Sequence, residues 1–307
     1  MVLLDKNYTT AISTYELLSK FEEEKKLKSL IQKGIYLIFV LSQSYPVENA
    51  ADFFSDSNFA MMEAHHEFKS SYEITKFGFF KQGLMSLRSG LELGVLSTYW
   101  SIVGKDDRTF KNWLRAREKT PFSNAMKKTL LTNPNIYIFN ERYCIKDLFD
   151  KLGFLHNYVH TQGKPHSTYG EFQKMIVGEE NNETLFEKWC QAFQCCVQLI
   201  VILHLLRFPI ASLKYDFIKK FGSYNKSPFC GGLFGDLQED LIRFIGQEKL
   251  NFIQDIAHKD DETMGLLEWL DSHPDLSQEE IDMIIAEEQR EWEEQEKMLR
   301  QMKLKTE

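Results

Sequence analysis

The chain is organised around LRSGLEL (residues 87–93), which lies inside a longer helical pattern from residue 70 to residue 104. Apolar side chains recur at spacings of three to five residues and so cover one side of a helix: Phe77, Phe80, Leu84, Leu87, Leu91 and Leu96. Four glycines lie in the same pattern, and each costs a helix about 1 kcal/mol relative to alanine: Gly78, Gly83, Gly90 and Gly94. Because glycine lets two backbones approach, we expect a neighbouring helix packed tightly against this one.

The composition of the whole chain indicates an all-α protein. Its 307 residues are 43% hydrophobic, which is enough for a sizeable core, and only 7 are proline. Helical periodicity also predicts helices at residues 9–43, 47–104, 108–119, 143–161 and 183–213. We expect a helical bundle with long central helices, in which the charged run at residues 22–26 is solvated. The composition of residues 133–135 indicates a loop.

Beyond residue 235 the charge balance changes. Residues 236–307 carry 21 acidic and 8 basic side chains, a net of −13, whereas the whole chain has a net charge of −8. Several glycines at residues 219–235 make this stretch the best candidate boundary. We therefore expect a bundle at residues 1–229 and a small acidic helical appendage at residues 230–307. A capping box from Ser277 to Glu280 is expected to open its final helix, after short helices at residues 236–245, 248–258 and 262–271.

The cysteines and the first residues predict a cytoplasmic protein. There are five cysteines, an odd number, and three fall within one expected helix, so we interpret them as reduced thiols. No Cys-x-x-Cys pair is present, and residues 1–6 lack a basic region followed by an apolar run. We expect no cofactor and no metal. The apolar run at residues 189–210 carries glutamines at helical spacing, which favours a bundle-core helix over a membrane span.

Arg88 and Glu92 stand four residues apart in the middle of the apolar helix and therefore share a face. One interpretation is an intrahelical ion pair, because an unpaired buried charge is costly. The other is a guanidinium that binds phosphate and is held in place by the carboxylate. The sequence leaves both interpretations open.

His156 and His160 also stand four residues apart, in the helix expected at residues 143–161. The periodicity of this helix places His156 on its apolar face, where a hydrogen-bonded core histidine is the ordinary expectation. His160 falls at the helix end beside a glycine-containing loop, where a histidine is open to solvent and can exchange a proton. A metal site would need a third ligand, and the candidates follow no motif spacing: Asp150, His166 and Glu171.

Together these two helices resemble the HEPN family of helical domains. The resemblance rests on Leu-Arg-Ser-x-Leu-Glu in the first helix and Asn-Tyr-Val-His-Thr at residues 157–161, and it covers about residues 58–213. HEPN-type domains are common in bacterial toxin, abortive-infection and anti-phage systems. Active members cut RNA without metal through an Arg–His pair, by attack of the ribose 2′-hydroxyl. The resemblance also implies a homodimer, because paired long helices present a broad apolar face.

The resemblance implies catalytic roles for His160 and His156, with Arg88 as phosphate ligand and Glu92 as its positioner. In active members an arginine precedes the histidine by a few residues, but residues 153–155 are Gly, Phe and Leu. The group that would stabilise the charged transition state is therefore missing from this helix. Either Arg88 supplies that charge from the neighbouring helix, or the protein is a degenerate member that binds RNA without cutting it.

A basic stretch follows the first of these helices. Its basic side chains include Arg108, Lys111, Arg115, Lys119, Lys127 and Lys128. Three of them share one face of the helix expected at residues 108–119, for which Asp107 is the expected N-cap, and Trp113 and Phe122 are interleaved. In an acidic protein such a stretch can contact a phosphate backbone. The alternative is an ordinary solvated helix, or a docking site for the acidic tail.

The helix expected at residues 277–302 carries an approximate heptad stripe of apolar side chains, which include Ile281, Ile285, Trp292 and Leu299. Such a stripe can dock into the groove of a partner protein. The alternative to an RNA-binding defence component is therefore a non-catalytic interaction protein that dimerises and docks a partner through this helix. A third interpretation is an adaptor whose acidic tail imitates nucleic acid and covers its own basic stretch.

Overall fold

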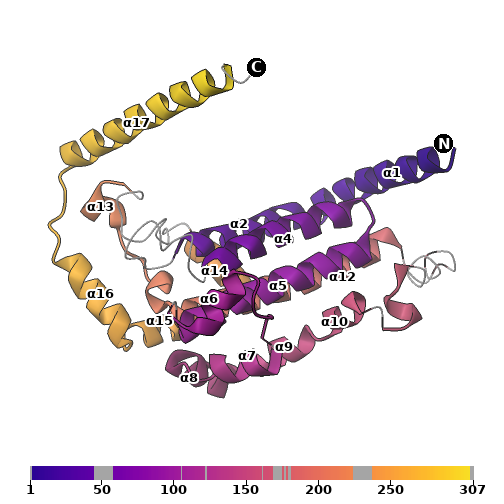
Figure 1. The fold of residues 1–307 in the computed structure, drawn as a ribbon, viewed down its shortest axis with the longest axis horizontal. Helices are drawn as coiled ribbons and strands as arrows, with labels where there is room; N and C mark the ends of the chain where they lie inside the picture. Colours follow the sequence, from indigo (N-terminus) through magenta and orange to yellow (C-terminus); the bar gives the residue numbers. More distant parts are fainter. Residues whose placement is uncertain are drawn as a thin grey trace.

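The computed structural model describes residues 2–44, 58–104, 106–121, 123–160, 162–168, 175, 178, 181–223 and 237–304. Every regular element within these residues is a helix, which confirms the predicted all-α class (Figure 1). The α-helices are α1 (Val2–Glu24), α2 (Leu27–Gln43), α4 (Asn58–Lys76), α5 (Phe80–Val103), α6 (Arg108–Leu114), α7 (Ser123–Leu130), α8 (Pro134–Tyr143), α9 (Ile145–Lys151), α10 (Phe154–Val159), α12 (Asn182–Arg207), α13 (Phe217–Phe221), α14 (Leu237–Ile245), α15 (Gln247–Ala257), α16 (Asp261–Asp271) and α17 (Gln278–Leu304). Short 3-10 helices lie at Lys164–His166 (η1) and Pro209–Ser212 (η2).

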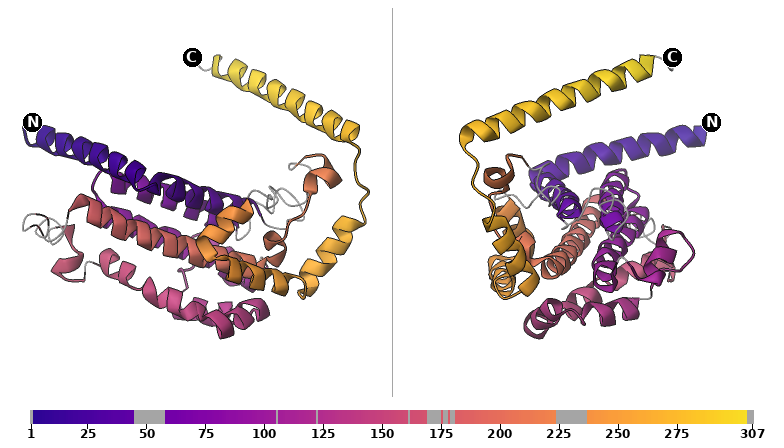
Figure 2. Two further views of the ribbon diagram at one scale, coloured as in Figure 1. Left: turned by 180° about the vertical axis from the view of Figure 1, so that it is seen from behind. Right: turned by 60° about the vertical axis from the view of Figure 1, so that its left-hand side comes forward.

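The core of the bundle is built on α12. Figures 1 and 2 show α5 and α12 between α1, α2 and α4 on one side and the chain of short helices α7 to α10 on the other. The most apolar window of α12 has a mean hydropathy of 1.7 and would pass as a membrane span by length and composition, but 78% of it is buried inside the bundle. This burial agrees with the expected bundle-core helix, since a core helix may be hydrophobic on every side.

Of the long helical pattern expected at residues 47–104, the described residues 58–104 form two helices, α4 and α5, joined by a turn. Gly78 forms this turn with a φ of 84°, a conformation that costs glycine little. A Cβ on Gly90 would come within 2.7 Å of the Phe68 ring on α4, and one on Gly94 within 2.5 Å of Ile200 on α12. The glycines of α5 therefore admit a helix on each side, which confirms the tight packing that their number predicted.

A buried polar cluster joins α1 to α4, and its acidic member was expected to be solvated. The side chain of Glu22 is almost fully buried, and its carboxylate accepts hydrogen bonds from Lys76 Nζ at 2.8 Å and from the Tyr72 hydroxyl at 2.7 Å. The Lys76 ammonium also lies 4.4 Å from the centre of the Tyr15 ring. Burial, helped by the bond to Glu22, raises the pKa of Tyr72 far above its ordinary value, so the phenol keeps the proton that it donates. The expectation of a solvated side chain was wrong for Glu22. It is one of three consecutive glutamates, and the sequence does not show which of them meets a partner.

Helices α14 and α15 pack on the same core as α2 and α12. Leu241 and Ile253 are buried in it, and Lys33 Nζ on α2 forms an ion pair with Asp240 on α14 at 2.6 Å. Gln198 of α12 donates a hydrogen bond to the Phe244 carbonyl at 3.0 Å. The boundary expected near residue 230 stays a prediction, because residues 224–236 lie outside the described part of the chain.

The chain then reaches α16 and a long final helix that leaves the body (Figures 1 and 2). The segment before α17 is held on α13, where Asp275 forms ion pairs with Lys219 at 2.7 Å and Lys220 at 2.8 Å. These two ammonium groups lower the pKa of Asp275 to about 2. The predicted capping box is confirmed: the Glu280 carboxylate accepts from the Ser277 amide at 2.8 Å, and the Ser277 hydroxyl accepts from the Glu280 amide at 3.3 Å.

His204 is a fully buried titratable group on α12, and the sequence analysis did not single it out. Burial lowers its pKa to about 3, with a smaller contribution in the same direction from Arg207. The unfolded chain binds a proton at this residue near pH 6.5, whereas the folded chain leaves it neutral down to about pH 3. Acid therefore favours the unfolded state across this window.

We predict that Lys76→Met costs about 3–5 kcal/mol of unfolding free energy, because it leaves the Glu22 carboxylate buried without its cation. Adding Glu22→Gln should recover much of this loss, since glutamine is uncharged and can still accept from Tyr72. Urea denaturation measures both. The control is Lys20→Met, which removes the cation of the exposed Lys20–Glu24 pair on α1, the helix that carries Glu22. This substitution should cost under about 0.5 kcal/mol. A Lys76→Met variant as stable as the control would show that the cluster does not support the fold.

We also predict that the unfolding free energy of the protein falls by about 2 kcal/mol more than that of His204→Asn between pH 7.5 and pH 5. The reason is that only the wild-type unfolded chain gains the His204 proton in that range. Denaturation curves at several pH values measure the two slopes. Parallel slopes would mean that His204 is protonated in the folded state as well.

Candidate functional site

The second helix of the candidate site is broken, and the break turns His156 to the surface, where His160 was already expected to lie. The helix expected at residues 143–161 is two helices, α9 and α10. Between them the amides of Gly153, Leu155 and His156 donate to carbonyls three residues back. Three residues per turn advance the chain further around the axis than the 3.6 of an α-helix. Leu155 is therefore fully buried and His156 is exposed, so the expectation of a core histidine at position 156 was wrong.

Arg88 and Glu92 form the intrahelical ion pair that one interpretation expected, with Arg88 Nη1 3.2 Å from Glu92 Oε2. The pair is not sealed in the core, because 18% of the Arg88 side chain and 37% of the Glu92 side chain remain exposed. Both residues line a cleft of about 330 Å³. The two interpretations are therefore compatible: the carboxylate holds the guanidinium in place at the wall of an open cavity.

This cleft, which we call the Arg88 cleft, brings together three separate segments of the chain. The α5 wall holds Arg88, Leu91, Glu92 and Val95; α7 supplies Met126 and Lys127; and the region from α9 to α10 supplies Phe149, Leu152, Gly153 and His156. The polar members are two permanent cations, one carboxylate and one imidazole, over a floor of apolar side chains. Such a set favours an anionic ligand and carries one group that can donate or accept a proton.

His160 lies beside the cleft and is not among its lining residues. The His156 and His160 rings are 4.3 Å apart between their centres, and both side chains are exposed. Of the two histidines, the structure brings together His156 with Arg88, whereas the sequence analysis favoured His160.

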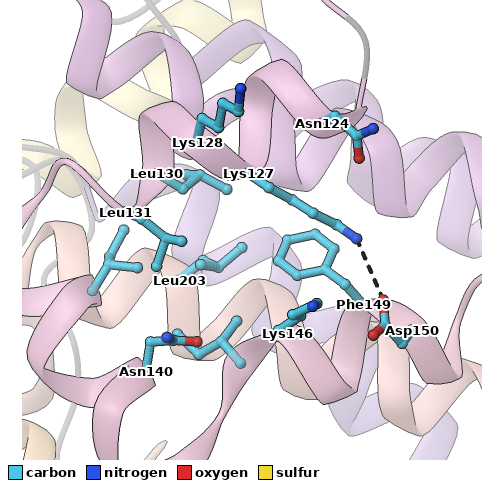
Figure 3. A pocket seen from close by; sticks show the side chains of 12 residues that line it. Asn124, Lys127, Lys128, Leu130, Leu131, Asn140, Lys146, Phe149, Asp150 and Leu203 are labelled. Carbon is cyan, nitrogen blue, oxygen red and sulfur yellow. Dashed lines mark ion pairs between the residues drawn. The ribbon is translucent and has the colours of Figure 1, made fainter.

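Lys127 is the member of the cleft that sequence reasoning did not connect with Arg88. Its ammonium forms an ion pair with Asp150 at 3.6 Å and lies 5.0 Å from the centre of the Phe149 ring. Figure 3 shows Lys127 reaching across toward Asp150, with the Phe149 ring beside it. The only signal in the sequence was its place in the basic stretch, which says nothing about which helix it faces.

The candidates for a third metal ligand have other neighbours. Asp150 pairs with Lys127, and His166 Nδ1 lies 2.9 Å from the Gln162 carbonyl oxygen. Glu171 lies outside the described residues. Across the described part of the chain, no group of three or more His, Cys, Asp or Glu side chains is arranged to hold a metal ion.

The basic stretch is shorter as a helix than expected. Asp107 is the predicted N-cap and accepts from the amides of Thr109 and Phe110, but α6 ends at Leu114. Ala116 takes a left-handed conformation with a φ of 55°, and the Arg117 amide donates to the Asn112 carbonyl, which closes the helix end. Of Lys111, Arg115 and Lys119, only Lys111 lies in α6, so the three side chains do not share one helix face.

The side chains of the basic stretch nevertheless lie at the surface. Arg108, Lys111, Arg115 and Lys119 are all exposed, and Lys111 forms an ion pair with Asp106 at 3.0 Å. Trp113 is not free to stack on a base, because it packs 5.7 Å from Trp100 between ring centres. Phe122 lies outside the described residues. Residues 108–119 therefore offer scattered surface charge and do not line the Arg88 cleft, whereas Lys127, further along the same stretch, does line it.

The stripe on α17 is divided between the body and the surface. Ile281 is buried at the first turn, and the next turn is anchored where Ile284 packs against Gly222. Further along, Ile285 is 40% exposed and Trp292 is 73% exposed. The side chain of Leu299 lies outside the described ones. The exposed part of the stripe thus begins where α17 leaves the body.

A scan of protein-family models and searches of curated proteins and of solved structures find no match to this chain.

Proposed function

We propose that this protein is a HEPN-like component of a bacterial defence or toxin-type module, and that it binds RNA at the Arg88 cleft. The observation that carries the proposal is the convergence of Arg88, Lys127 and His156 on one solvent-open cavity. These three side chains come from α5, α7 and α10. Charged or titratable side chains from three helices meet where the resemblance implies a phosphate site.

The charge of the protein supports a local contact of this kind. The net charge of −8 arises in residues 236–307, which carry −13, so residues 1–235 carry +5 and can attract a polyanion. Among the lining residues of the cleft, the two permanent cations outnumber the single carboxylate of Glu92, because Asp150, the partner of Lys127, is not one of them. The Phe149 ring adds a flat apolar face on which an unpaired base can stack, which favours single-stranded RNA over a duplex.

We propose binding without efficient cleavage as the main activity. Metal-free cleavage needs one group to remove the ribose 2′-proton, another to protonate the leaving 5′-oxygen, and a cation to stabilise the phosphorane. His156 is the only histidine among the lining residues of the cleft, and Arg88 is held by Glu92. This set supplies the cation and one proton carrier. Any RNase activity is therefore vestigial.

We predict that Arg88→Gln weakens binding of a fluorescein-labelled single-stranded RNA by about 1–2 kcal/mol, or roughly fivefold to thirtyfold in Kd. Lys127→Ala should weaken it less and should reduce the slope of log Kd against log salt by about one. Fluorescence anisotropy measures both. Lys111→Ala and Arg115→Ala are matched controls, because they remove exposed cations outside the cleft.

Wild-type protein that binds no RNA, or controls that lose as much affinity as Arg88→Gln, would contradict the cleft as the binding site. The same samples in EDTA test for cleavage. Loss of slow cleavage in His156→Ala but not in His160→Ala would assign the proton carrier.

A second function is favoured by the exposed stripe of α17. We propose that the protein also docks a partner protein through this helix, and that the homodimer implied by the HEPN resemblance is formed by the bundle. Residues 278–304 carry nine acidic and four basic side chains around Ile285 and Trp292. The fitting partner therefore has an apolar groove with a basic rim.

We predict that Trp292→Asp abolishes co-purification of a protein encoded alongside this one, because it places a charge in the apolar groove of the partner. Deletion of residues 277–307 should have the same effect, because it removes the docking helix. Met283→Asp is the matched control, since Met283 is exposed at 64% and lies on the opposite side of the helix. Quantitative pull-down compares the three with wild type. Equal capture by all of them would remove α17 from the interface.

A further inference from the structure

A second cavity lies next to the Arg88 cleft and has a different chemistry. It measures about 570 Å³ and is enclosed by α7, α8 and α9 over the central helix α12 (Figure 3). Its floor is apolar and comes from all four helices: Leu130, Ile136, Ile145 and Leu203. These floor residues are almost completely buried, so the cavity reaches the core of the bundle.

The rim of this cavity is polar and has an excess of positive charge. Lys127, Lys128 and Lys146 line it against the single carboxylate of Asp150. In Figure 3 the Lys127 chain crosses the cavity toward Asp150, whereas the Lys128 ammonium points outward. The Lys127–Asp150 pair is long, at 3.6 Å, and the Asp150 side chain is 59% exposed, so the pair is weak. An incoming anion can compete with Asp150 for this ammonium.

We propose that this cavity binds a small organic anion that has an apolar body and a carboxylate or phosphate head. The body would lie on the Leu and Ile floor, and the head would lie between the ammonium groups of Lys127 and Lys146. Volume supports a small molecule, because ligand cavities typically measure about 300–1,000 Å³ and are mostly apolar with a few polar groups. The inference does not rest on RNA binding, since Arg88 is not among the residues that line this cavity.

The charge and shape of the cavity weigh against other occupants. A metal cation would face three ammonium groups and one carboxylate, which is a repulsive set. An RNA strand would use the rim but has no apolar chain to place on a buried aliphatic floor. An uncharged apolar molecule would use the floor but would make no use of the cationic rim. An anion with an apolar body uses both halves of the cavity.

Isothermal titration of the full-length protein with decanoate and, separately, with phenyl phosphate tests the proposal and distinguishes an aliphatic carboxylate from an aromatic phosphate. Acetate supplies a head without a body. We expect one of the first two to bind with a stoichiometry of one and acetate not to bind. Lys146→Glu should raise that Kd at least about fivefold, because it reverses a charge beside the head.

Leu131→Ser should raise the same Kd about twofold to threefold, because it removes part of the apolar wall at a residue that is exposed and therefore tolerates substitution. Lys151→Glu on α9 is the matched control and should bind as wild type does, since Lys151 does not line the cavity. Arg88→Gln should keep this ligand even if it loses RNA, so the two proposals fail separately. No binding of either ligand, equal binding of acetate, or binding that survives both Lys146→Glu and Leu131→Ser overturns the proposal.

Discussion

The structure depends on the close approach of α5 to α4 on one side and to α12 on the other. A side chain of even one carbon at Gly90 or Gly94 would collide with Phe68 or Ile200, so these positions set how near the helices lie. Because the backbones are close, the faces of α5 that pack on α4 and α12 have no room for long side chains. The long polar side chains of α5 therefore project from its remaining face. Arg88 and Glu92 take this direction, which is where α7 and α10 meet the bundle.

Local features of this protein could be predicted from the sequence because their causes are local. The capping box at Ser277 and the N-cap at Asp107 each need only a side chain and an amide two or three residues away. The ion pair of Arg88 with Glu92 follows from a spacing of one turn.

One local expectation was wrong. Residues 133–135 were expected to form a loop, yet Asn133 caps α8 and Pro134 begins it, because proline fits the first turn of a helix.

The features that could not be predicted are those set by distant packing. Apolar periodicity placed His156 inside, but a tightened turn at Gly153 buried Leu155 in its place. Glu22 is one of three consecutive glutamates, and only the position of α4 shows that it meets Lys76. Lys127 belongs to a run of basic residues whose direction depends on how α7 folds back over α5. Arg88 and Glu92 could therefore be predicted as a pair on one helix, whereas Lys127 and His156 could be placed beside them only from the fold.

Lys127 and Phe149 form a partition between two chambers, since both residues line the Arg88 cleft and the larger cavity beside it. One ammonium group cannot neutralise an anion in each chamber at full strength at the same time. An anion that binds in one chamber and draws the Lys127 ammonium toward itself would lower the affinity of the other chamber for its own anion. By thermodynamic reciprocity, the second anion would lower the affinity for the first by the same factor. Two anions bound at the same time would therefore compete for the single Lys127 ammonium.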